Sequence, residues 1–172
     1  MLALGLSQLL FTQISMAEAL NFNSNDTVTI VADNAREGDQ VDVIHFSGNF
    51  ELRAPDWYLS ADSATVYGKL DNPEKVVLEG NPAKIYFLRN SNKTATPSNE
   101  TSAEPTWEDI EGTALKIEYL RLSNKLKMTG SATLKRKENQ LSSEVIEYDI
   151  DADRYSARGD GGINIQVNPS ND

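Results

Sequence analysis

The chain contains no cysteine, which excludes disulfide bonds, thiolate metal sites and cysteine nucleophiles. It has one histidine, His45, so no metal site can combine two histidines. Basic residues are also scarce, with 16 Lys and Arg against 26 Asp and Glu and a net charge of −10. A protein that neutralises nucleic-acid phosphates needs the opposite sign, so we expect no nucleic-acid partner. We also expect no cofactor.

Long apolar runs are absent after Ala19. Residues 1–19 are rich in Leu, Ile, Phe and Ala, and Ala17-Glu18-Ala19 supplies the small-x-small pattern of a signal-peptidase site. We predict a cleaved secretory signal here, with a retained membrane anchor and a helix that is not a signal as the alternatives. This segment is short and polar for a spanning helix. Residues 20–168 then form one domain, followed by a tail at 169–172.

From residue 28 onward, short runs alternate apolar and polar residues between Gly, Asn and Asp, which is typical of half-buried strands. Two kinds of segment recur in turn. The first is an apolar-x-Ala-Asp-x-Ala pattern, at 30–35 and 59–64, with looser copies at 110–115 and 141–146. The second is an apolar-x-Gly pattern, at 46–50, 78–82, 128–132 and 157–161. The repeats predict four hairpin-like pairs.

One interval between repeats is longer than the others. The separation of Asp33 from Asp62 equals that of Gly130 from Gly159, whereas Gly80 and Gly130 lie much further apart in the chain. The excess falls on residues 90–108, which are rich in Asn, Ser, Thr and Pro. We predict an inserted loop at 90–108.

Aspartate and glycine are unfavourable inside strands, so their regular recurrence needs a structural reason. A β-bulge supplies one, because it bends the strand and shifts the side-chain alternation by one residue. Apolar positions do shift in this way, from Trp57 and Leu59 before Asp62 to Val66 after it. We therefore assign a structural role to Asp33, Asp62 and Glu144 rather than metal binding.

The pattern predicts eight to ten bent antiparallel strands, folded as two facing sheets or a flattened jelly roll. Their apolar faces should share one interior. The predicted lining is Val28, Ile30, Ile44, Phe46, Phe50, Leu52, Trp57, Leu59, Val66, Leu78, Ile85, Phe87, Ile117, Leu126, Met128, Leu134 and Ile146, with Ala64, Val76, Leu115, Leu141, Ile163 and Ile165 as further interior residues. Periodicity alone is equally typical of an ordinary sandwich core that binds nothing.

Seven segments in this order resemble a known family. They are Ile30-x-Ala32-Asp33, Phe46-x-Gly48-Asn49, Leu59-x-Ala61-Asp62-x-Ala64, Glu79-Gly80-Asn81-Pro82-Ala83, Gly112-x-Ala114-x-x-Ile117-x-Tyr119, Leu126-x-Met128-x-Gly130-x-Ala132 and Ile146-x-Tyr148-Asp149. Over residues 28–167 the chain resembles the OstA-like domain of LptA-type periplasmic proteins. The segments 90–108 and 1–19 depart from the compact family pattern.

The resemblance implies an all-β, open, slightly twisted β jelly roll that carries lipopolysaccharide through the periplasm of a Gram-negative bacterium. Family members hold acyl chains against the first strands, here at Val28 and Ile30, so the lining above is the predicted lipid-binding set. We expect edge strands at 28–32 and 163–167. The first would meet an LptC-like domain or a preceding copy, and the second an LptD-like domain or a following copy, which permits a head-to-tail homo-oligomer.

Other functions remain open at this point. An LptC-like subunit would keep residues 1–20 as an anchor, and a self-assembling β scaffold would have a dry core. A carbohydrate-active enzyme needs two cooperating carboxylates, and no spacing here indicates such a pair. We therefore expect no catalysis. A basic patch, Lys125, Lys127, Lys135, Arg136 and Lys137, could contact lipid phosphates, but a solvated strand face is the preferred interpretation.

Overall fold

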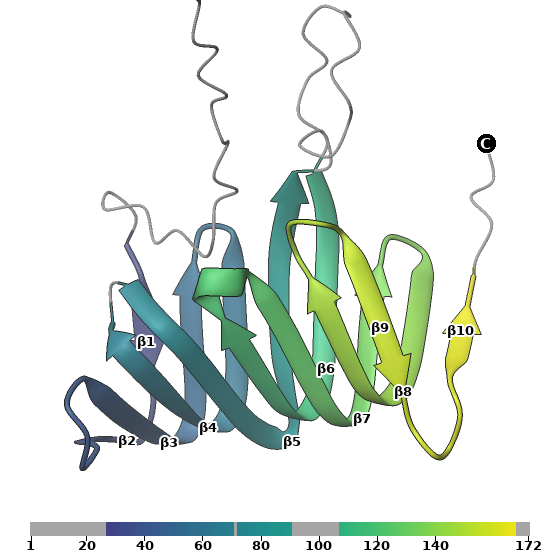
Figure 1. Cartoon of the computed structure of the whole chain (residues 1–172). Coiled ribbons are helices and arrows are strands. Elements are labelled where there is room, and N and C mark those ends of the chain that lie inside the picture. The colour runs from purple at the N-terminus through teal and green to yellow at the C-terminus, as the bar shows by residue number, and fades with distance from the viewer. Residues whose placement is uncertain (1–26, 71, 91–106, 168–172) are drawn as a thin grey trace, which may run out of the picture.

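The computed structural model describes residues 27–70, 72–90 and 107–167 (Figure 1). The predicted signal at 1–19, residues 91–106 of the predicted insertion and the tail at 169–172 lie outside these residues. The strands are β1 (Thr29–Val31), β2 (Asn34–Glu37), β3 (Val43–Ala54), β4 (Trp57–Lys69), β5 (Asn72–Asn90), β6 (Trp107–Leu120), β7 (Lys125–Arg136), β8 (Asn139–Asp149), β9 (Arg154–Arg158) and β10 (Asn164–Gln166). A 3-10 turn, η2 (Arg121–Ser123), joins β6 to β7.

These strands form one antiparallel sheet in the order β1-β3-β4-β5-β6-β7-β8-β10. Consecutive strands pair from β3 to β8, as the repeats predict. At each end the edge is divided between two short strands, because β1 and β2 both pair with β3, and β9 and β10 both pair with β8. The all-β fold with open edges is confirmed.

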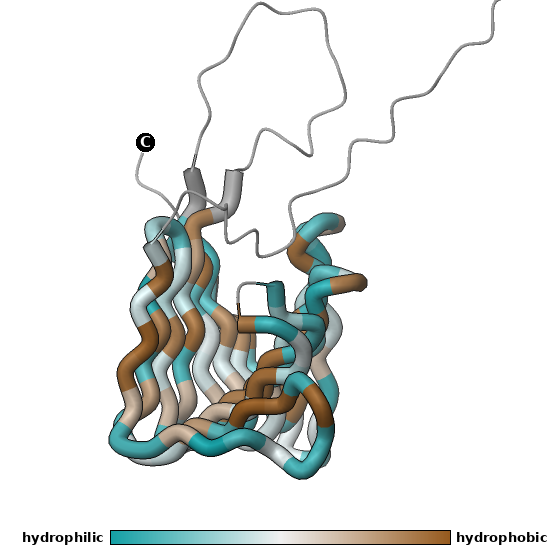
Figure 2. Tube along the Cα trace, turned by 90° about the vertical axis from the view of Figure 1, so that its left-hand side faces the viewer, coloured by the Kyte–Doolittle hydropathy of each residue, from teal (hydrophilic) through white to brown (hydrophobic). Residues whose placement is uncertain are grey.

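Every pairing between β3 and β8 has an irregularity near its middle. The register shifts lie between Ser47 and Phe50, Ser60 and Ser63, Glu79 and Ala83, Thr113 and Lys116, and Thr129 and Ala132. They form one row across the sheet, and each strand bends there, so that the sheet folds into two facing arms (Figure 2). The predicted bulges therefore produce the bend that brings the two arms face to face.

We name the two arms by their residues. Arm A contains 34–47, 63–69, 72–79, 116–120, 125–129, 145–149 and 154–158. Arm B contains 29–31, 50–61, 83–90, 107–114, 132–143 and 164–166.

At the bend, each recurring glycine lies against a residue of the segment that precedes it in the alternating series. The pairs are Gly48 with Asp33, Gly80 with Asp62, Gly130 with Leu115 and Gly159 with Glu144. A Cβ at Gly48 would overlap the Asp33 carboxylate, which accepts a hydrogen bond from the Asn49 side chain at 2.9 Å. The Asp33 N–H donates to the Gly48 carbonyl at 2.8 Å. The apolar-x-Ala-Asp-x-Ala and apolar-x-Gly segments therefore recur together because they contact each other at the bend.

Side-chain alternation shifts at the bend as the sequence predicts. In β4, Leu59 is buried before the bulge, and Ala64 and Val66 are buried after it. In β5, Leu78 and Ile85 show the same shift around residues 80–82.

Three predicted interior positions are wrong. Leu115 is 48% exposed because it is the unpaired bulge residue of β6 and packs outward beneath Gly130. Ile163 and Ile165 are 51% and 56% exposed, because the short edge around β10 pairs only with residues 140–142 and has no further strand beside it among the described residues.

Within the described ranges, no helix has the length and apolar character that crossing a membrane requires.

Candidate functional site

The candidate site is the apolar interior between the two arms, formed by a cluster of buried hydrophobic residues. Figure 2 shows brown, apolar positions alternating with polar ones along the strands of both arms. Most of the predicted lining is buried in one cluster: Phe46, Phe50, Leu52, Leu59, Val66, Leu78, Ile85, Phe87, Ile117, Leu126, Met128, Leu134 and Ile146. Val28, Ile30, Ile44 and Trp57 are partly buried and pack against it. Ala64, Val76 and Leu141 also belong to the cluster. The structure therefore brings all 17 residues of the predicted lining together, whereas Leu115, Ile163 and Ile165 lie outside it. Contact of the lining with lipid stays a prediction.

Sequence reasoning missed several members of this interior. Tyr119 and Tyr148 are buried, and they continue the alternation two residues after Ile117 and Ile146. That period was a usable signal. Ile110 and Ala132 were missed as well.

Side chains fill this interior closely. The space among Leu59, Val76, Leu78, Ile85, Ile117 and Tyr119 has no room for a water molecule. The arms therefore pack on each other in this structure. An acyl chain can lie between them only after they separate.

Aromatic rings connect the arms along the ends remote from the bend. Trp57 stacks on Phe87 within arm B, with ring centroids 4.5 Å apart. Trp57 also contacts Tyr119 of arm A at 5.8 Å, and Phe87 contacts Tyr148 of arm A at 6.4 Å. We call these four residues the aromatic seam.

The two tyrosines of the seam direct their hydroxyls to polar partners, as buried tyrosines usually do. Tyr119 donates to the side chain of Asn124 at 3.0 Å, and Asn124 donates to Asp151 at 2.6 Å. Tyr148 donates to Asp153 at 2.8 Å. Polar groups thus border the apolar interior on the side where the arms can open.

Arg136 corrects one prediction about the basic patch. It does not lie on a solvated strand face, because its guanidinium contacts Asp153 at 2.6 Å and lies 5.8 Å from the Tyr148 ring centre. Lys125, by contrast, is exposed and pairs with Asp149 at 3.5 Å. His45 faces away from the interior, as its alternation with Phe46 predicts, and shares a hydrogen bond of 3.0 Å with Thr65.

The outer face carries ordinary charged pairs. A hydrogen bond from Lys75, with N–O distance 2.8 Å, lowers the pKa of Glu118. Tyr86 donates to Asp109 at 2.8 Å, and this bond to a carboxylate raises the pKa of Tyr86. These pairs couple neighbouring strands and lie away from the interior. No cluster of three or more metal-binding side chains occurs among the described residues.

Both predicted edge strands are confirmed as edges. β1 pairs only with β3, and β10 only with β8, in the part of the chain that the structure describes. Tyr155, Ile163, Ile165 and Val167 expose apolar surface near the C-terminal edge. An open edge with exposed apolar side chains can accept another strand.

One antiparallel sheet, bent along a row of bulges around a shared apolar interior and open at both edges, defines an open β jelly roll. A family model described as LptA/(LptD N-terminal domain) LPS transport protein matches residues 29–154. The chain belongs to this family, which takes part in lipopolysaccharide transport.

A solved structure shares the fold. It is LptH from Pseudomonas aeruginosa, described as the LptA homologous periplasmic component of the conserved lipopolysaccharide transport device. The TM-score is 0.64 at 19% identity, and the match covers 83% of this chain and 96% of that one. No curated protein matches the chain by sequence.

Proposed function

We propose that this protein is a non-enzymatic periplasmic carrier that shields lipopolysaccharide acyl chains between its arms on their way from the inner to the outer membrane. The observation that carries the proposal is the apolar interior shared by both arms of a single sheet whose edges are open. A sheet of this kind can separate its arms without breaking strand pairing, because no strand in the described part of the chain closes it into a barrel.

The hydrophobic effect is large enough for this task. Each buried methylene contributes about 0.8 kcal/mol, so ten methylenes contribute about 8 kcal/mol before ordering costs. That gain has to offset the separation of the arms and the repulsion between an anionic headgroup and a chain of net charge −10. Several acyl chains on one lipid multiply the gain, and no catalytic group is needed.

The edges support a continuous route. A strand added at β1 by an LptC-like domain or a preceding copy would extend the sheet in one direction. A strand added at β10 by an LptD-like domain or a following copy would extend it in the other. Since the two edges differ, such assembly is head-to-tail and would align successive interiors.

Site-specific photo-crosslinking in living cells tests the carrier role. A photoreactive residue at Ile30, Phe46 or Leu59 should give lipopolysaccharide adducts, whereas one at His45, on the outer face, should give none. Equal labelling at His45, or no labelling at the three inner positions, would refute the proposal. The mature mass separates a soluble carrier from an anchored subunit, because cleavage after Ala19 removes the segment 1–19.

A further inference from the structure

Arg136 connects the end of β7 to the turn after β8, two places that a straight β7 would keep far apart. Arg136 ends β7, and Lys125, at the other end of β7, pairs with Asp149 of β8. Eleven residues of extended strand span about 36 Å. Nevertheless, the Arg136 guanidinium lies 2.6 Å from Asp153, which follows Asp149 in the next turn. The bend in β7 returns Arg136 to the turn between β8 and β9.

The guanidinium is held from two sides but is not fully satisfied. Its terminal nitrogen donates to Asp153, and its plane lies over Tyr148, which also donates to Asp153. The Nε of Arg136 is buried and has no hydrogen-bond acceptor within the described part of the chain. A buried donor without an acceptor destabilises the closed arrangement, because it has lost its hydrogen bonds to water. Arginine thus presents an unused donor next to the apolar interior.

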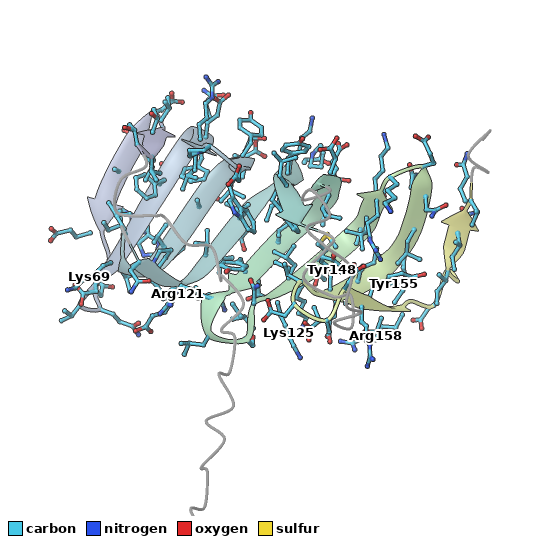
Figure 3. The ribbon with its side chains drawn as sticks, turned by 90° about the horizontal axis from the view of Figure 1, so that it is seen from above. Lys69, Arg121, Lys125, Tyr148, Tyr155 and Arg158 are labelled. Atoms are coloured by element: carbon cyan, nitrogen blue, oxygen red, sulfur yellow. The ribbon has the colours of Figure 1, made fainter. Side chains whose placement is uncertain are left out.

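Separation of the arms would change this contact directly. Tyr148 belongs to arm A and Asp153 to the turn that follows it, whereas Arg136 belongs to arm B. In Figure 3, which looks down on the arms, Tyr148 lies on the inner side of its arm, whereas Arg158 points outward. If acyl chains parted the arms, Arg136 would move away from Asp153 and would offer both Nε and its terminal nitrogen. These donors form the planar fork that matches a phosphate.

We propose that Arg136 is a headgroup-binding residue, at which the phosphate of a bound acylated lipid takes the place of Asp153. The inference rests on the proposed carrier function and adds a polar specificity to it. Acyl chains between the arms place the first polar group of the lipid at the open side, where Arg136 lies. Loading then exchanges an internal ion pair for one with the ligand, so the bridge between the arms opens more readily when a phosphorylated lipid is present to replace it.

Equilibrium binding of two lipids to the full chain tests this assignment. The probes are lipid A carrying its phosphates and phosphate-free lipid A with the same acyl chains. The wild type should bind the phosphorylated form at least about tenfold more tightly, which corresponds to one good charge-assisted contact. Arg136→Met should reduce this ratio towards one, and Arg136→Lys should leave an intermediate ratio, because it keeps the charge but loses the fork.

Two further variants separate the role of Arg136 from general effects. Asp153→Asn removes the competing carboxylate and should increase affinity for the phosphorylated lipid. Arg158→Met removes an exposed arginine that pairs with Glu147 at 3.0 Å on the outer face, and it should leave the ratio unchanged. Thermal unfolding of each variant identifies losses of fold. The ratio of affinities for the two lipids, measured for the wild type and for Arg136→Lys, tests the assignment even if Arg136→Met does not fold.

The outcomes distinguish the two proposals. If the wild type binds neither lipid, both the carrier function and the role of Arg136 are refuted. If it binds both lipids equally, or if Arg136→Met keeps the wild-type ratio, only the assignment of Arg136 fails. Inorganic phosphate alone should neither bind nor displace lipid, because the arms stay closed without acyl chains. Displacement by inorganic phosphate at equal concentration would overturn the link between loading and phosphate.

Discussion

Residue 48 shows how the absence of a side chain at one position decides the shape of a strand. Gly48 has φ of 77°, in the left-handed region that glycine adopts without strain. A Cβ there would also overlap the Asp33 carboxylate. Conformation and contact both require glycine at this bulge. The same steric contact recurs at Gly130 and Leu115, although leucine replaces the acidic residue.

We expect Gly48→Ala to destabilise the protein by about 1–3 kcal/mol, because it adds strain at a positive φ and a clash with Asp33. Gly161→Ala is the matched control, since nothing lies within 4 Å of its Cβ position. Urea denaturation followed by circular dichroism measures both. Equal midpoints for the two variants would show that the bulge contact does not stabilise the bend.

The sequence predicted side-chain burial correctly where a single geometric rule determines it. The shift of apolar positions around Asp62 follows from the geometry of a bulge, and it is sufficient to locate the bend. The prediction that Leu115 lies in the interior was wrong, because an apolar residue can occupy a bulge and face outward. The prediction that Arg136 lies on a solvated strand face was wrong, because its burial depends on a contact between strand ends that only the folded-back sheet creates. Local pattern carries no information about such a contact.

At the scale of elements, the edges follow the same bend as the central strands. β1 and β2 divide one edge on either side of Asp33, and β9 and β10 divide the other near Gly159. A partner can therefore add to the arm B part of an edge without touching the arm A part. The short β10, with Ile165 exposed, adds apolar surface to the arm B part of the C-terminal edge.

Ile165→Lys should weaken head-to-tail association at least several-fold, because it places a charge in the apolar contact made by an added strand. Leu122→Lys is the control, since Leu122 is 85% exposed on η2 and lies away from both edges. Sedimentation velocity over a concentration series measures the association. If both variants associate like the wild type, β10 is not the self-association edge.

At the scale of the molecule, the aromatic seam determines whether the interior is accessible. Trp57 and Phe87 face Tyr119 and Tyr148 across the arms. The space behind them, among Leu59, Val76, Leu78, Ile85, Ile117 and Tyr119, has no room for a water molecule. The sequence indicated this interior but not its closure, because packing between arms depends on how far the sheet bends. We therefore expect lipid to enter only after whole arms move apart.

Cross-linking the arms should block this movement. The chain has no native cysteine, so cysteines replacing Trp57 and Tyr119 can be joined with a short bis-maleimide. We expect lipid binding to fall at least tenfold after cross-linking compared with the same variant before the reaction, or about 1.4 kcal/mol or more. A pair replacing Lys75 and Glu118, which lie 2.8 Å apart within arm A, is the control. Undiminished binding in the cross-linked seam variant would show that the arms need not separate.

The bend is assembled from local contacts. These contacts also determine how such molecules can change in length. Each glycine and its facing bulge complete one fold of the sheet locally, once in every repeat. Duplication or loss of such a unit would lengthen or shorten the molecule along its axis and leave its cross-section the same. The distance spanned by one subunit is thus a property that evolution, or a protein engineer, can adjust in whole steps.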